Sequence, residues 1–209
     1  MVSLSKARIR LGNPVVFGFA ILLGGAAALL GWALNIPTLF RIHTTGIPIS
    51  INSAICFMLG GASLAIPAGL PARRRAQIVF VLAGAVTLIA VAELTEIIFG
   101  VSFGIDLDDV QRPFHTSVRY PGQMAPNSAL GFLLAGIALI CANCANNSFA
   151  RRTVRFLTFS VLFIGVTGGI AYFINLQFLY SWHGVKRMSL ITLPPVTFKS
   201  MSIRLQSRY

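Results

Sequence analysis

The sequence predicts an all-α integral membrane protein of three repeated transmembrane helical hairpins, with five firm spans and a degenerate sixth. Three observations carry this prediction: the composition, a motif that occurs twice, and the order of apolar runs and basic loops. Of the 209 residues, 56% are hydrophobic and 11% are charged, and the mean hydropathy is +0.78. A soluble domain carries about 25% charged residues. The chain therefore has too little charge to cover a surface that faces water.

The repeated motif reads INSAICFMLGG at 51–61 and PNSALGFLLAG at 126–136. Each copy opens a long apolar run and follows a loop that carries a histidine. Apolar composition alone does not readily place Asn-Ser-Ala, Phe and Gly in register. The repeat predicts a duplicated unit, a pair of membrane helices.

Five apolar runs are long enough for the roughly 20 residues of a spanning helix. They are Pro14–Ile36, Pro48–Leu70, Ala76–Phe99, Ala125–Ala145 and Val154–Tyr180. A sixth run starts at Met188, but Pro194 and Pro195 would remove helix hydrogen bonds that lipid cannot replace. We therefore expect a cytoplasmic segment at 1–13, a membrane domain at 14–190, and a degenerate sixth helix with a basic tail at 191–209.

The basic residues predict the orientation. Nine lie before the first run or in the second and fourth loops, against five in the alternate loops: Lys6, Arg8, Arg10, Arg73, Arg74, Arg75, Arg151, Arg152 and Arg155 against Arg41, Arg112, Arg119, Lys186 and Arg187. Such asymmetry places the N-terminus in the cytoplasm. We expect a multi-pass protein of a bacterial inner membrane with the lipid bilayer as its partner. The net charge of +12 reflects these topology signals, so nucleic acid is not expected as a partner.

Glu93 and Glu96 are the only carboxylates inside a predicted span. An ionisable group in a membrane helix is costly and suggests a functional site. The pair is predicted near the outer interface, where water or a basic loop residue could neutralise it structurally. The alternative is a ligand-sensing or proton-sensing role.

Asn52, Ser53, Asn127 and Ser128 start the two copies of the motif. Asn and Ser at a helix start commonly cap free backbone N–H groups, which is the structural interpretation. They could instead bond across helices or line a polar pocket, so all four are ligand-sensing candidates.

Three loop histidines, His43, His115 and His183, occur once per predicted hairpin. Together they could bind a transition metal, but loop histidines are usually solvated, and we predict no metal. Cys141 and Cys144 have CxxC spacing without a second pair, and no phosphate loop or nucleophile motif is present. The chain is therefore expected to be neither an enzyme nor a cofactor protein.

Several segments resemble the multi-helix N-terminal membrane regions of bacterial sensor histidine kinases and diguanylate cyclases, of the MASE-like sensor type. They are LGWAL at 30–34, LTEIIFGV at 94–101 with GID at 104–106, PGQMAPNSALGFLLAG at 121–136, and RMSL at 187–190. The resemblance covers about residues 14 to 190 and implies sensory input.

Such regions normally feed a soluble output domain, and 19 residues follow Leu190 here. We therefore expect a signal-input module that acts through a separate signalling output protein or a homodimer, or a truncated receptor. A small transport or accessory protein is the alternative; a transporter would need a polar cavity at mid-membrane.

Overall fold

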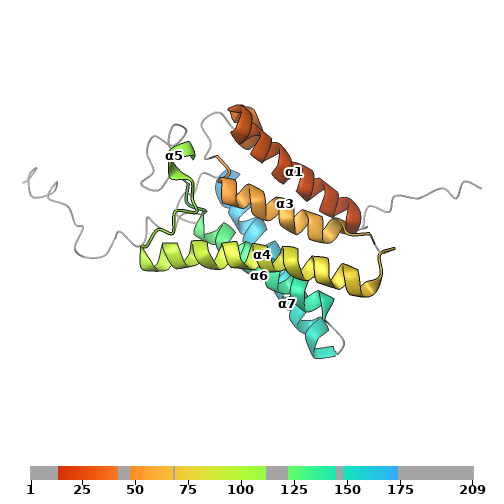
Figure 1. The fold of residues 1–209 in the computed structure, drawn as a ribbon. Helices are drawn as coiled ribbons and strands as arrows, with labels where there is room; N and C mark the ends of the chain where they lie inside the picture. Colours follow the sequence, from red (N-terminus) through yellow and green to blue (C-terminus); the bar gives the residue numbers. More distant parts are fainter. Residues whose placement is uncertain (1–13, 42–47, 68, 112–121, 145–147, 174–209) are drawn as a thin grey trace, which may run out of the picture. The chain divides into compact units, whose positions relative to one another are not determined.

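A computed structural model describes residues 14–41, 48–67, 69–111, 122–144 and 148–173 (Figure 1). Every secondary-structure element in these ranges is a helix, which confirms the all-α prediction for them. The helices are α1 (Pro14–Leu34), α2 (Pro37–Phe40), α3 (Ile51–Ala65), α4 (Ala72–Phe99), α5 (Asp108–Gln111), α6 (Pro126–Asn143) and α7 (Ser148–Phe173). Met1–Val166 forms one compact unit and Thr167–Tyr209 a second, of which only the end of α7 is described.

Three of the described helices, α1, α4 and α6, are long and apolar enough to cross a membrane. This supports a membrane protein but corrects the prediction of five firm spans. The predicted run 48–70 yields only the 15 residues of α3, because the chain is still extended at its N-cap, Ser50, and leaves the helix before Pro67. At 1.5 Å per residue α3 is about 22 Å long, short of the roughly 30 Å of a hydrocarbon core.

The predicted run 154–180 corresponds to α7, which begins earlier, at Ser148, and is described to Phe173. This helix is not among the three candidate spans. The segments 1–13 and 174–209, which include the predicted sixth helix, lie outside the described residues.

Helices α1 and α3 form an antiparallel pair held by close backbone contact. A Cβ added to Gly25 of α1 would lie 2.7 Å from the Ala54 carbonyl oxygen and from the Met58 nitrogen of α3. The small residue lets the two backbones approach, as in membrane helix pairs generally. At one end of the pair the Trp32 ring stacks on Phe40 with centroids 4.1 Å apart, and its Nε1–H donates to the Ile49 carbonyl oxygen at 2.9 Å.

Helices α4 and α6 form a second antiparallel pair. A Cβ added to Gly136 of α6 would lie 3.0 Å from the Ala83 carbonyl oxygen of α4. At the start of α4, Asn143 Nδ2 donates to the Ala76 carbonyl oxygen at 2.9 Å. The Met124 backbone N–H, just before α6, bonds near the other end of α4. These two bonds fix the relative direction of the two helices.

The α1–α3 and α4–α6 pairs meet through α3, which packs on α4 and touches α6 (Figure 1). Phe57 of α3 and Phe132 of α6 make an edge-to-face contact with centroids 4.9 Å apart. Buried Cys56, Val86 and Met124 belong to a shared apolar core. Contacts between the pairs are fewer than those within each pair.

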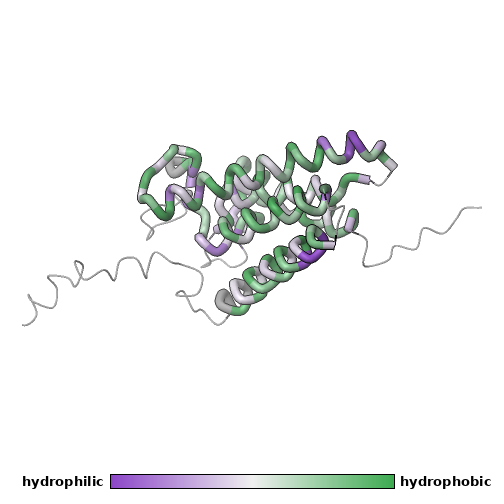
Figure 2. The backbone as a smooth tube through the Cα atoms, turned by 90° about the horizontal axis from the view of Figure 1, so that it is seen from below, coloured by the Kyte–Doolittle hydropathy of each residue, from purple (hydrophilic) through white to green (hydrophobic). Residues whose placement is uncertain are grey.

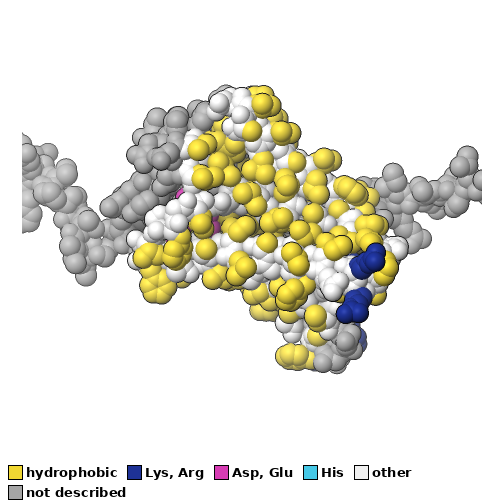
Figure 3. Space-filling view, viewed as in Figure 1, with side chains coloured by type: hydrophobic (Ala, Val, Ile, Leu, Met, Phe, Trp, Pro, Cys, Tyr) yellow, Lys and Arg dark blue, Asp and Glu magenta, His cyan; other side chains and the backbone are white. Residues whose placement is uncertain are grey.

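The outward surface of these helices is apolar. Leu23 of α1 is 62% exposed and Leu88 of α4 is 72% exposed, and Figure 2 shows hydrophobic residues along most of each helix. In Figure 3 the visible arginine side chains gather at one end of the face. Such a surface suits lipid, which does not penalise exposed apolar side chains.

The two copies of the repeated motif begin α3 and α6, as the repeat predicted for helix starts. Both starts lie at the C-terminal end of α4, because Asn52 and Met124 each bond to Glu93 there. The exposed arginines 73–75 begin α4 at its other end. The two copies of the motif therefore begin helices whose starts both lie beside Glu93.

Candidate functional site

Three carboxylates meet at the C-terminal end of α4. Glu93 and Glu96 lie on α4, and Asp106 lies in the segment between α4 and α5. They are 0%, 1% and 5% exposed, and each offers an oxygen within 4.8 Å of the others. The chain folds over the helix end and buries both glutamates, so the expectation that they reach water is wrong. The other expected partner, a basic residue of the following loop, is not tested because Arg112 and Arg119 lie outside the described residues.

Two glycines allow this fold-back. Gly100 caps α4 with φ +67° and donates its N–H to the Glu96 carbonyl oxygen at 2.8 Å, and Gly104 has φ +74°. Residues with a Cβ rarely adopt this conformation. The returning chain donates the Phe103 backbone N–H to Glu96 Oε1. It thereby brings Asp106 beside the two glutamates.

Glu93 is the best-bonded of the three carboxylates. Asn52 Nδ2 of α3 donates to its Oε1 at 2.7 Å, and the Met124 backbone N–H donates to its Oε2 at 3.0 Å. Asn52 Nδ2 also lies 3.1 Å from the Ile105 carbonyl oxygen, to which it donates. Glu93 therefore joins α3, α4 and the segment before α6.

The capping interpretation of Asn52 and Ser53 is wrong in detail. Ser50 is the N-cap of α3, and its Oγ accepts the Ser53 backbone N–H at 3.3 Å. The Ser53 hydroxyl pairs with the Ser50 hydroxyl at 2.8 Å. Asn52 instead makes a hydrogen bond across helices, as the alternative interpretation predicted, because its side-chain amide faces Glu93 of α4.

Asn127 and Ser128, the corresponding pair of the second copy, lie partly buried in the first turn of α6. The N-cap of α6 is Ala125, whose side chain makes no capping bond. Just before the start of the second copy, the backbone N–H of Met124 donates to Glu93 Oε2. His43, His115 and His183 lie outside the described residues, so the histidine-metal hypothesis stays a hypothesis.

Sequence reasoning missed Asp106 and Gln111. Gln111 is completely buried, and its Nε2 donates to the Asp106 carbonyl oxygen at 2.7 Å. The available signal was the pair of glycines at 100 and 104, which permit a turn between the glutamate helix and the acidic segment. Because Asp106 and Gln111 are distant from the two glutamates in the sequence, their approach in the fold could not be predicted from local patterns.

The electrostatics of the cluster favour a bound positive charge or a proton. Burial raises the pKa of Asp106 to about 8, and the negative charges of Glu93 and Glu96 beside it act in the same direction. Among the described residues, Glu96 Oε2, Asp106 Oδ1 and Gln111 Oε1 are buried without a hydrogen-bond partner. Each of these atoms is an acceptor of hydrogen bonds or a ligand of cations.

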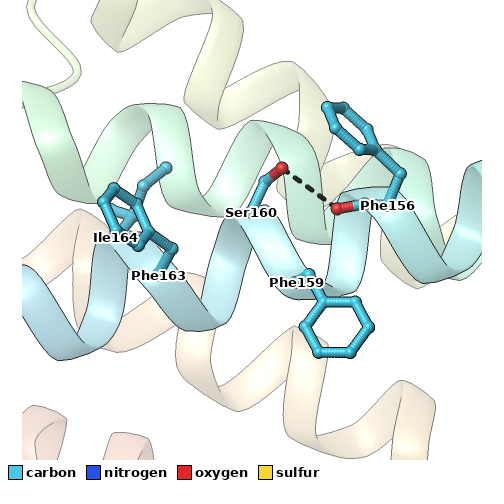
Figure 4. A pocket seen from close by; sticks show the side chains of 5 residues that line it. All are labelled: Phe156, Phe159, Ser160, Phe163 and Ile164. Atoms are coloured by element: carbon cyan, nitrogen blue, oxygen red, sulfur yellow. Dashed lines mark hydrogen bonds between the residues drawn. The ribbon is translucent and has the colours of Figure 1, made fainter.

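A shallow hollow on α7 is a weaker candidate. It is lined by Phe156, Phe159, Ser160, Phe163 and Ile164, all from one helix (Figure 4). The Ser160 hydroxyl donates to the Phe156 carbonyl oxygen of its own helix at 3.0 Å, so it offers no free polar group specific to this surface. The exposed phenyl rings suit lipid or another helix.

No family model, no curated protein and no solved structure matches this chain. The chemistry of the carboxylate cluster is therefore the basis for a functional proposal.

Proposed function

We propose that this chain is a membrane-embedded signal-input module of a bacterial receptor, and that the carboxylate cluster receives the signal. The observation that carries the proposal is the Asn52–Glu93 bond at 2.7 Å. Asn52 belongs to the α1–α3 pair and Glu93 to the α4–α6 pair. A change of charge at the cluster therefore acts on the bond that joins the two pairs.

The mechanism is a shift between two arrangements of the helix pairs. Each pair is tightly packed within itself, whereas fewer contacts join one pair to the other. A ligand that changes the charge of Glu93 changes the strength of the Asn52 bond, since bonds to ionised groups are stronger than neutral ones. The ligand can shift the equilibrium only by its differential affinity for the two arrangements.

The topology of this proposal follows the basic residues. The N-terminus and arginines 73–75 lie in the cytoplasm of a bacterial inner membrane, and the carboxylate cluster lies toward the outer side. The complete domain consists of three repeated hairpins, with α7 as a fifth span and a degenerate sixth helix. The signal passes from the cytoplasmic helix ends to a separate output protein or through a homodimer. The resemblance to MASE-like sensor regions supports this reading.

The position of the cluster favours sensing over transport. Glu93 and Glu96 lie in the last two turns of the 28-residue α4, whereas transporters bind their substrates near the midplane. A group near one face is suited to detecting conditions on that side.

Distance measurement tests the proposal. Spin labels at Leu23 of α1 and Leu88 of α4, both on the exposed surface, report the separation of the two pairs in the full chain in nanodiscs. Glu96→Gln replaces one of the three carboxylates of the cluster with a neutral amide and keeps the side-chain volume. We expect it to shift the Leu23–Leu88 distance distribution by about 2 Å or more, the scale of helix shifts in switching proteins.

A label pair at Leu88 and Ala142 of α6, within one helix pair, is the control and should not shift. An unchanged Leu23–Leu88 distribution in Glu96→Gln and in a Glu93→Gln variant would overturn the proposed function.

A further inference from the structure

The three carboxylates are spaced for a single ion. Calcium is bound by oxygen atoms at about 2.3–2.6 Å, so two ligands on opposite sides of one ion lie about 4.8 Å apart. The oxygens of Glu93, Glu96 and Asp106 lie within 4.8 Å of one another. Magnesium usually keeps several waters and takes only one or two carboxylates from the protein, whereas calcium takes a larger set of carboxylate and amide oxygens. Three carboxylates and an amide oxygen in one buried place therefore favour calcium.

The hydrogen bonds around the cluster leave room for a cation. Glu93 accepts two N–H groups and Glu96 accepts one. Among the described residues, no N–H or hydroxyl group donates to Glu96 Oε2 or Asp106 Oδ1, although both residues are more than nine-tenths buried, and the Asp106 carboxyl group lies within hydrogen-bonding reach of Glu93 and Glu96. Buried carboxylates without compensation are costly, and a cation provides compensation to several of them at once.

Gln111 adds an independent indication. It is a neutral residue, 0% exposed, anchored beside the cluster by the bond from its Nε2 to the Asp106 carbonyl oxygen. Its Oε1 has no partner among the described residues. An amide oxygen of this kind is a common calcium ligand alongside carboxylates. Glu96 Oε2, Asp106 Oδ1 and Gln111 Oε1 are oxygens of the type that hard cations bind.

We propose that Glu93, Glu96 and Asp106, with the Gln111 amide oxygen, form a binding site for a divalent cation of the calcium type. The proposal rests on the proposed function for its role as a signal, while the binding itself stands on the site geometry. Since the cluster is placed toward the outer side, we expect an affinity of about 10⁻⁴–10⁻³ M, as in extracellular calcium sites. Bound calcium would hold the α4–α5 segment against α4.

Direct binding to the full chain tests the site. Calcium chloride is titrated into the chelator-treated protein in nanodiscs, and bound calcium is measured by calorimetry or equilibrium dialysis. We expect saturable binding of one ion, tighter than magnesium under the same conditions. Asp106→Asn and Glu96→Gln should each weaken calcium binding by about tenfold or more, because ligand charge sets affinity in such sites. Asp109→Asn, which removes an equal charge three positions further along the sequence, is the matched control.

The outcomes separate this proposal from the proposed function. Saturable binding lost in Asp106→Asn and kept in Asp109→Asn supports the site. No saturable calcium binding by the wild-type chain, or equal weakening by Asp109→Asn, overturns it, as does preferential binding of magnesium. The Leu23–Leu88 distance tests signalling independently. If the chain binds calcium but the distance does not change, the calcium site is supported and the proposed signalling function is overturned. If Glu96→Gln changes the distance but the wild-type chain binds no calcium, the signalling function is supported and the calcium site is overturned.

Discussion

The bond between Asn52 and Glu93 gives the sharpest test of how the two helix pairs are joined. Asn52→Ala removes two bonds from Nδ2, one to Glu93 Oε1 at 2.7 Å and one to the Ile105 carbonyl oxygen at 3.1 Å. Asn52 is 6% exposed and Glu93 is 0% exposed, so water cannot readily replace the lost donor.

The magnitude follows from the two bonds. A hydrogen bond to a charged group contributes about 1.5–3 kcal/mol and a neutral one about 0.5–1.5 kcal/mol. We therefore expect Asn52→Ala to lower the free energy of unfolding by about 2–4 kcal/mol. The assay is reversible unfolding of the full chain by SDS in bicelles, followed by circular dichroism.

Ser63→Ala is the matched control on the same helix. Ser63 is equally buried, at 6% exposed, but its Oγ bonds only to the Leu59 carbonyl oxygen one turn back. The Leu59 carbonyl oxygen keeps its backbone hydrogen bond within the helix when the hydroxyl group is removed. We therefore expect Ser63→Ala to lower the free energy of unfolding by less than about 1 kcal/mol. If Asn52→Ala costs no more than Ser63→Ala, the cross-helix bond does not stabilise the fold and the reasoning fails.

A double-mutant cycle with Glu93→Gln isolates the pair. Glutamine keeps an acceptor oxygen but removes the charge, so Asn52→Ala should cost about 1 kcal/mol less in that background. An equal cost in both backgrounds would show that Asn52 and Glu93 are not coupled.

Three other predictions concern packing, pH and topology. Gly25→Ala should destabilise the chain by about 1–3 kcal/mol because its methyl group meets the α3 backbone, whereas Gly24→Ala faces open space and should be neutral or stabilising; unfolding in bicelles compares the two. In the presence of a chelator, the free energy of unfolding should fall as pH rises from about 4 to about 8, by at most about 1.4 kcal/mol per pH unit. The reason is that the folded state holds the Asp106 proton more tightly than the unfolded state does. Asp106→Asn should flatten this slope, and an unchanged slope would show that Asp106 is not the group responsible. A membrane-impermeant maleimide should label exposed Cys144 in inverted vesicles but not in spheroplasts and should leave buried Cys56 unmodified; labelling of Cys144 in spheroplasts would reverse the orientation.

Much of the local structure could be predicted from the sequence. The starts of α3 and α6 were marked by the repeated motif, and the apolar runs of α1, α4 and α6 predicted helices long enough to span a membrane. These features depend on hydrophobicity and on residues close together in the chain. The length of α3 was overestimated because hydropathy does not report where an apolar segment is extended rather than helical.

The sequence by itself determined that this is an all-helical protein suited to a membrane, with two glutamates on one helix and a repeated Asn-Ser-Ala at two helix starts. Only the tertiary structure decided what those residues do. It buried Glu93 and Glu96, turned Asn52 from a capping candidate into a bond between helix pairs, and brought Asp106 and Gln111 to the same place. The physical reason is that hydrophobicity is read from local composition, whereas the environment of a carboxylate depends on which distant segment covers it. Here that segment is a turn permitted by Gly100 and Gly104.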